Sequence, residues 1–156
     1  MVVLLGGVGL VFWPAAKGTV FLYGHSDVGV VKNGLQVDLE IDKSENPPHH
    51  VIATAVATIK NVTTGKIYLY SVNGHGFFHL GLVTFLGLRV FMPEMGEGAI
   101  GVSTTTLEPG GKMTWRERIP ENLAAKIHGS RVVAVVWPSG AELPAISNPC
   151  LFEQEN

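Results

Sequence analysis

Short segments of strand-like composition, separated by turn residues, are the feature that most constrains the fold of this chain. The clearest is LQVDLEID at 35–42, in which apolar and polar residues alternate for eight positions. A period of two is typical of a β-strand with one buried face and one wet face. Further strand-like segments occupy 19–23, 50–60, 66–72, 77–91, 102–107, 112–119, 131–137 and 143–152, and only 120–127 resembles a helix. Strands of this length with turns about every 8–12 residues predict an all-β, antiparallel sandwich or barrel.

Three segments carry further information about their place in a sheet. Residues 131–137 (RVVAVVW) are apolar almost throughout, which predicts a central strand. Pro144 and Pro149 interrupt the last segment. Because proline lacks a backbone N–H, we expect that strand at a sheet edge. Two glycines interrupt 77–91, which predicts two short strands there.

An apolar run without charge stands at the start of the chain, over Val2–Trp13. It is too short to span a bilayer, which takes about 20 residues, but its length suits the core of a secretory signal with Ala16 before the cleavage point. The alternative is an extra strand or arm that adds to the open sheet edge of a neighbouring copy. We therefore separate residues 1–18, an apolar arm or signal remnant, from a single sandwich domain at 19–156. The predicted assembly contacts of the arm are Val2, Val3, Leu4, Leu5, Leu10, Val11, Phe12 and Trp13.

Charge is scarce in this chain and is unevenly spread. Charged residues make up 15% of the sequence, against about 25% in an average soluble domain. With 11 basic and 13 acidic residues the formal net charge is −2, which argues against nucleic-acid binding, since that needs a clustered basic face. Residues 1–16 carry no charge, and 66–92 carry only Lys66 and Arg89. We expect another copy to cover the first segment and the domain's own core to cover the second.

Catalytic motifs are not evident. A single cysteine, Cys150, excludes an intrachain disulfide and a cysteine-ligated zinc site. Asp38, Glu40 and Asp42 share one face of their strand and are interpreted as its solvated side, because an acid–base pair needs unequal environments. We therefore predict no catalytic residue and no cofactor, and expect that the chain is not an enzyme.

Several longer segments carry a family resemblance. They read VIATAVATIKNVTTGKIYLY at 51–70, TTTLEPGGKMTW at 104–115, SRVVAVVW at 130–137 and AISNPCLFE at 145–153. With the alternating strand at 35–42, they resemble the immunoglobulin-like accessory domains of prokaryotic surface and secreted proteins, over about three quarters of the chain. This resemblance implies an immunoglobulin-like antiparallel β-sandwich, here with an extra N-terminal strand or arm. A fold does not fix a function.

Two inhibitor families of this architecture share local features with the chain. BsuPI-type proteinase inhibitors have an L-x-P-G turn before a tryptophan-bearing strand, similar to Leu107–Trp115. Chagasin-type inhibitors of cysteine proteases use three loops at one end of the sandwich, which resemble 61–65, 96–101 and 136–138. As an alternative function, the resemblance implies a proteinase inhibitor, with these contact residues: Asn61, Thr63, Thr64, Gly65, Gly98, Trp137 and Pro138.

Histidines and aromatic residues provide two further candidate sites. His75, His79 and His49 are the candidate ligands of a histidine metal site, although their spacing matches no known zinc motif. Five aromatic residues are candidates for a carbohydrate or partner platform, but most such rings in a sandwich belong to the core: Trp13, Trp115, Trp137, Tyr68 and Tyr70. The primary prediction therefore carries no metal.

The preferred function is a non-enzymatic structural or interaction protein. It is a self-assembling subunit of a surface layer, a filament or a virus particle, or an extracellular accessory domain. The expected partner is the chain itself or another protein, with no nucleic acid. A membrane contact is expected only if residues 2–13 act as a signal or an anchor. The predicted location is extracellular, on the cell surface or in a virion.

Overall fold

The computed structural model describes residues 20–23, 28–43, 51–72, 78–84, 87–91 and 101–153. The predicted arm at 1–18 lies outside these residues. The described elements are β1 (Val20–Tyr23), β2 (Leu35–Asp42), β3 (Val51–Asn61), β4 (Ile67–Val72), β5 (Phe78–Thr84), β6 (Gly87–Phe91), β7 (Val102–Leu107), β8 (Lys112–Pro120), α1 (Glu121–Ile127), β9 (Ser130–Val136), β10 (Ala145–Ile146) and β11 (Cys150–Phe152).

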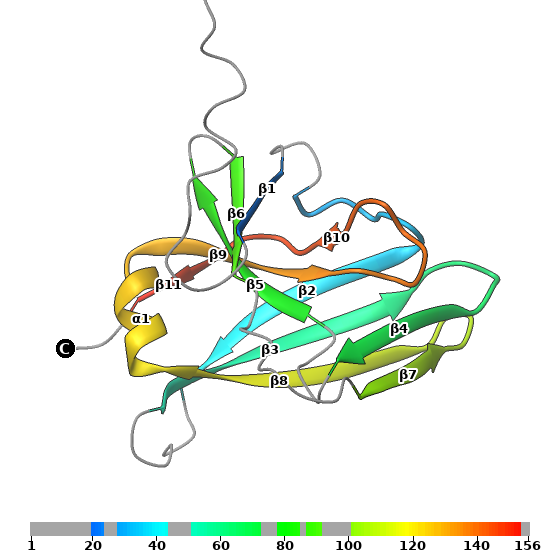
Figure 1. Ribbon diagram of the computed structural model, residues 1–156, viewed down its shortest axis with the longest axis horizontal. Helices are drawn as coiled ribbons and strands as arrows, with labels where there is room; N and C mark the ends of the chain where they lie inside the picture. The colour runs from blue at the N-terminus through cyan, green and yellow to red at the C-terminus, as the bar shows by residue number, and fades with distance from the viewer. Residues whose placement is uncertain are drawn as a thin grey trace, which may run out of the picture.

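The strands form three antiparallel sheets (Figure 1). Sheet A has the order β1-β6-β5-β9-β10, with β11 also paired to β9. Sheet B has the order β2-β3-β8, and sheet C consists of β4 and β7. Sheet A curls, so that β5, β6 and β1 rise away from sheet B in Figure 1. The fold is mostly β, with one short helix and a curled half-barrel among its sheets, and the prediction of a β-rich antiparallel chain is confirmed.

Three strand pairs are nested within one another along the chain. Strand β5 pairs with β6, β4 pairs with β7 outside them, and β3 pairs with β8 outside both. The connections from β3 to β4 and from β7 to β8 therefore meet at the same end of the ladders. In the sequence, residues 62–111 separate the two paired strands β3 and β8.

The main core lies between sheet B and the facing side of sheet A. It contains Leu35 and Val37 of β2, Ala55 of β3, and Val132 and Ala134 of β9, all buried. The helix α1 adds its own buried residues, Ala124 and Ile127, to this core. The sequence alternation of β2 is confirmed, because its inward residues are buried or half-buried and its outward residues Gln36, Asp38 and Glu40 are exposed.

A second, smaller core lies on the opposite face of β9. Val133 and Val135 of β9 pack there with Leu88 and Val90 of β6 and with Ile146. Strand β9 is thus buried on both faces, which confirms its predicted central position. Strands β5 and β6 supply residues to the two cores, so the expectation that the domain's own core covers 66–92 is confirmed for these strands. It is wrong for β4, whose Tyr68 and Tyr70 are exposed.

The last predicted strand, 143–152, is interrupted, as its prolines indicated. It forms two short strands, β10 and β11, which pair with the same edge of β9. Between them Ser147 takes over the ladder: its Oγ accepts a hydrogen bond from the Ala134 N–H at 2.9 Å, while its own N–H donates to the Ala134 carbonyl at 2.9 Å. Pro149, which has no N–H to donate, follows in the interruption. The predicted edge position is confirmed.

The single described helix, α1, begins directly after β8. Pro120 precedes it in an extended conformation, and Glu121 and Lys126 occupy its first and last turns, where their charges complement the helix dipole. Gly129, with φ +67°, ends it in the left-handed region. Within the described parts of the chain, no helix has the length and apolar character needed to cross a membrane.

Candidate interaction site

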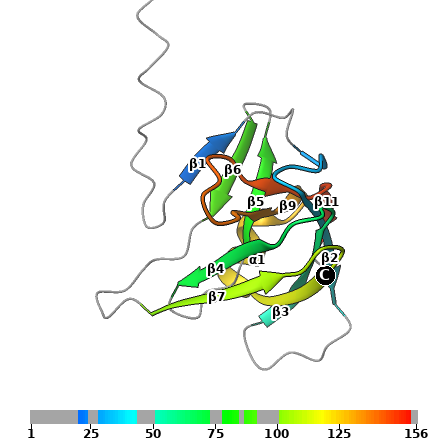
Figure 2. The same cartoon turned by 90° about the vertical axis from the view of Figure 1, so that its right-hand side faces the viewer.

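Sheet C, hereafter the ribbon, presents the largest exposed hydrophobic side chains among the strand residues whose burial the structure describes. Tyr68 and Tyr70 of β4 are 47% and 48% exposed and lie on the same face. Across the ladder they pair with Thr106 and Thr104 of β7, which are also exposed. The expectation that these two rings belong to the core is therefore wrong. Figure 2 shows the two strands of the ribbon, β4 and β7, side by side at the front of the molecule.

The outer edge of β7 has no strand partner among the described residues. Its sequence, VSTTTL, has no charged residue and no proline. Natural proteins usually protect such an edge with lysine, proline, a bulge or a covering segment, because the unpaired N–H and C=O groups can pair with another chain. The β-branched residues of β7 favour an extended conformation. The backbone N–H and C=O groups of this edge can therefore pair with a further strand.

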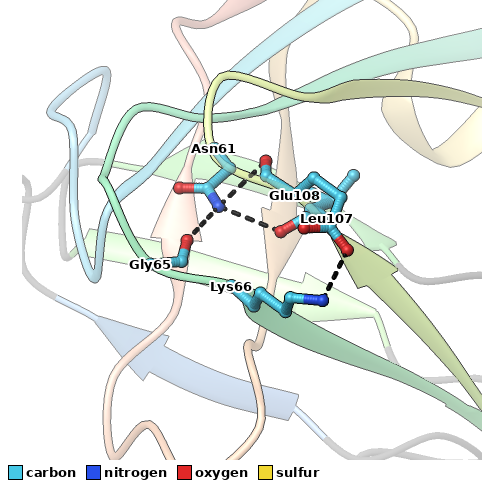
Figure 3. Close-up of polar contacts among 5 residues, drawn as sticks. All are labelled: Asn61, Gly65, Lys66, Leu107 and Glu108. Atoms are coloured by element: carbon cyan, nitrogen blue, oxygen red, sulfur yellow. Dashed lines mark hydrogen bonds and ion pairs between the residues drawn. The ribbon is translucent and has the colours of Figure 1, made fainter.

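Asn61 holds the corner of the molecule where the ribbon joins sheet B (Figure 3). Its side-chain Nδ2 donates to the carbonyl of Gly65 at 2.7 Å, of Leu107 at 3.0 Å and of Glu108 at 3.2 Å. The backbone N–H of Asn61 donates to the Gly111 carbonyl at 2.9 Å. One buried residue thus binds both connections, β3 to β4 and β7 to β8.

The oxygen of the same amide shapes the turn that follows. Asn61 Oδ1 accepts from the Thr63 N–H at 2.9 Å and from the Thr63 Oγ at 2.8 Å. This is an Asx turn, in which the side chain replaces a backbone acceptor. Asn61 is 0% exposed, so the formal glycosylation motif Asn61-Val62-Thr63 presents no accessible amide in this fold.

An ion pair closes the corner on its solvent side. Lys66 Nζ lies 2.9 Å from Glu108 Oε1, and both side chains are more than half exposed. The hydrogen bond and the negative charge of Glu108 raise the pKa of Lys66. Because both side chains are solvent-exposed, the ion pair contributes little to the stability of the fold.

A second turn at this corner was missed by sequence reasoning. Asn33 and Gly34 have φ +52° and +74°, and Lys32 and Leu35 exchange two backbone hydrogen bonds around them. This is a two-residue hairpin turn of the type that Asn-Gly favours, so the dipeptide itself was the available signal. The Gly34 carbonyl accepts from the Val62 N–H at 2.9 Å, which ties this turn to the Asn61 turn.

The structure separates the residues of the predicted inhibitor loops. Thr63, Thr64 and Gly65 are exposed in the corner turn, but Asn61 is buried beneath them. Gly98 lies outside the described residues. The described Gly101 precedes Val102, which pairs with Val72. That pair marks the end of the ribbon opposite to the corner turn.

The third predicted inhibitor loop meets the ribbon from another side. Pro138 is buried and forms a bridge with Leu69, and the Ser139 N–H donates to the Tyr68 carbonyl at 2.8 Å. Trp137 is half-buried and its ring centroid lies 5.9 Å from that of His79. Only two of the three predicted loops are described in full, so the inhibitor alternative stays a prediction.

The histidine alternative receives no support from the described geometry. His79 is half-buried on β5 against Trp137, whereas His75 and His49 lie outside the described residues. Across the described ranges, no three His, Cys, Asp or Glu side chains come together as metal ligands. Cys150 is half-buried with a free thiol.

Burial strongly changes the acidity of the Glu117 carboxyl group. It lies on the inward face of β8 between Trp115 and Ile119, opposite the buried Ala55 of β3. Its Oε2 is buried and has no hydrogen-bond partner. Loss of solvent raises the pKa of Glu117 to about 7.

Comparison with known proteins adds no relative to this picture. The sequence matches no protein-family model, and no curated protein matches it. The resemblance to accessory domains and inhibitors therefore depends only on the segments that carry it.

Proposed function

We propose that this chain is a non-enzymatic structural or interaction protein that self-associates by strand addition. In this proposal the apolar run at 2–13 of one copy pairs with the outer edge of β7 in the next. The observation that carries it is the unprotected, uncharged edge of β7, which is unpaired among the described residues. Main-chain hydrogen bonds then give affinity, and side-chain contacts give register.

The chemistry of the two segments is compatible. The run Val2–Trp13 has no charge and neither has β7, so their pairing removes no charged group from water. The six residues of β7 extend over roughly 20 Å, which an equal length of the run would match. The arm's apolar side chains would cover Val102, which is 59% exposed, and the exposed tyrosines beside it.

The proposal includes the fold type and the setting expected from the sequence. We interpret the packing of sheet B on sheet A as an elaborated immunoglobulin-like sandwich, because two antiparallel sheets enclose the main core. Such a subunit would serve in a surface layer, a filament or a virus particle, or as an extracellular accessory domain. Its partner is a second copy of the chain.

Sedimentation velocity tests the proposal directly. We expect the full chain to form assemblies that grow with concentration, and a chain that begins at Thr19 to lose this growth. In the full chain, the double substitution Thr104→Lys/Thr106→Lys places charge on the β7 edge and should abolish the growth in the same way. The matched control, Asn122→Lys/Ala125→Lys, adds the same charge at two exposed positions of α1 and should assemble like the unmodified chain.

Two results would overturn the proposal. One is assembly of the chain from Thr19 to the same extent as the full chain. The other is a full chain that is monomeric at every concentration reached. Circular dichroism of each variant establishes that the β fold is retained.

A further inference from the structure

The outward face of sheet B divides its charges between its two edge strands. On β2 the outward residues are Gln36, Asp38, Glu40 and Asp42; on β3 they are Lys60, Thr58, Val56 and Thr54; on β8 they are Lys112, Thr114, Arg116 and Arg118. One edge therefore carries three acids and no base, and the other carries three bases and no acid. We name this surface the polarised face. Its central row is uncharged except at Lys60.

Solvent reaches most of the polarised face. Asp38 and Glu40 on the acidic edge are exposed, as are Lys112 and Arg118 on the basic edge. Within one copy, Arg116 Nη1 reaches across β3 to Asp42 Oδ2 at 3.4 Å. The two side chains of this pair are 54% and 23% exposed, so each keeps part of its surface open to a partner. The pattern of acid on one side and base on the other is complementary to itself.

We infer that the polarised face binds a second copy of the chain, face to face, with the two-fold axis parallel to β3. Rotation about that axis places the acidic β2 of each copy over the basic β8 of the other. Glu40 then faces Arg116, and Asp42 faces Arg118. The same contact occurs twice, as in any isologous dimer. This surface is distinct from β7, so the inference does not depend on the proposed function.

The other face-to-face arrangement is excluded by charge. A two-fold axis perpendicular to the strands would place β2 over β2 and β8 over β8, so that like charges meet along both edges. With the axis along β3, only residues of the central row meet their own counterparts. These are Val56 and Thr58, which are uncharged and half-buried, and Lys60 at one end, where its long side chain can turn into solvent; Thr54 at the other end is already buried within one copy. An uncharged centre within a charged rim is the usual composition of an interface.

The area of the face indicates a weak, salt-sensitive dimer. Eight residues on each of three strands cover roughly 400 Å² per copy, from the strand spacing and rise. The pair would bury roughly 800 Å², below the range of about 1,200–2,000 Å² for stable complexes. We expect dissociation constants in the high micromolar range and loss of the dimer as salt screens the charges.

Charge exchange in the full chain provides the test. Arg116→Glu/Arg118→Glu makes the basic edge acidic at its two facing positions, and Glu40→Lys/Asp42→Lys makes the acidic edge basic at the positions opposite them. Each variant loses the Arg116–Asp42 pair within its own copy, both alone and in the mixture, so this loss cancels. Each substitution changes the charge by two, so the variants carry −6 and +2 instead of −2. Each variant alone should dimerise at least tenfold more weakly than the unmodified chain in sedimentation equilibrium. Their equimolar mixture should recover the lost affinity, because both edges are again complementary.

A matched control separates this geometry from attraction between net charges. Lys126→Glu/Arg131→Glu and Glu142→Lys/Glu153→Lys reach the same −6 and +2 at exposed positions outside the polarised face. Their mixture should show no gain over the unmodified chain. The inference is overturned if the first mixture gains nothing over its components, or if the control mixture gains as much. Strand addition through 2–13 is common to all four variants and cancels in the comparison.

Discussion

The ribbon and sheet B are two exposed β surfaces of one molecule, and they manage their open edges differently. The edge strands of sheet B, β2 and β8, carry the acids and bases of the polarised face. Neither strand of the ribbon carries a charge. Charge on an edge strand opposes uncontrolled pairing, while its absence leaves the backbone groups accessible. Between these two surfaces, the charges are thus concentrated on sheet B and absent from the ribbon. This difference distinguishes a protected surface from an unprotected one.

The largest expected effect lies at the corner that joins these two surfaces. Replacing Asn61 by Asp removes a buried donor from three carbonyl groups and introduces a charge near them. We expect a loss of about 3 kcal/mol of unfolding free energy, measured by urea denaturation. The control is Asn33→Gly, which removes one exposed hydrogen bond to Leu143 and keeps the positive φ. It should cost less than about 1 kcal/mol, and equal losses would contradict the role of Asn61.

The second prediction concerns the inward face of β8. Burial raises the pKa of Glu117 to about 7 from 4.5, so the unfolded state loses this proton at lower pH than the folded state. The stability that depends on protonated Glu117 is fully present below pH 4.5 and is lost as the pH rises through 7. The total loss is at most about 3 kcal/mol. Glu117→Gln should remove this part of the pH dependence.

Denaturation curves at several pH values test this prediction. The difference in stability between Glu117→Gln and the unmodified chain cancels the titration of the histidines. It should grow from pH 5 to pH 7.5 in favour of the glutamine variant. A difference that is independent of pH would show that Glu117 is solvated in the folded protein.

A smaller effect is expected from the tyrosines of the ribbon. Tyr68→Ser and Tyr70→Ser each remove one cross-strand pair, with Thr106 and Thr104 respectively. Each should cost about 0.5–1 kcal/mol of stability. If the ribbon is an interaction surface, the loss of assembly in sedimentation velocity should exceed what this small destabilisation explains. A variant that assembles normally would limit these rings to a structural role.

The smallest effect is expected at the exposed ion pair of the corner. Lys66→Ala removes the partner of Glu108, but both side chains are solvated. We expect no measurable change in the urea midpoint and no change in its salt dependence. A clear loss of stability would show that the pair, together with Asn61, holds the corner.

Local sequence patterns predicted most strands but not their partners. The alternation in 35–42 and the apolar run at 131–137 correctly located a half-buried strand and a central strand. A two-residue period shows which residues of a strand share a face, but it does not show which other strand pairs with it. The pairing of β4 with β7, across Ile67 and Leu107, depends on contacts between residues far apart in sequence.

The candidate site was predictable only in part, for similar reasons. Asn61 and Thr63 were placed in a loop by the resemblance, yet the three carbonyl groups held by Asn61 come from both connections of the corner. Tyr68 and Tyr70 were expected in the core because aromatic rings usually pack there. They are exposed because Leu69, between them, points inward and occupies the buried side of the strand.

The nested order of strand pairs has a consequence for the way the chain folds. Once β5 and β6 have closed their short connection, β4 and β7 are brought near each other, and their pairing in turn brings β3 and β8 together. Each step then closes a shorter effective loop than the sequence separation of its strands suggests, which lowers its entropic cost. Residues of β5 and β6 should therefore have high φ-values in folding kinetics, and those of β3 and β8 lower ones. The strand pairs would then form in order from β5–β6 outward, and the hydrogen bonds of Asn61 would form last.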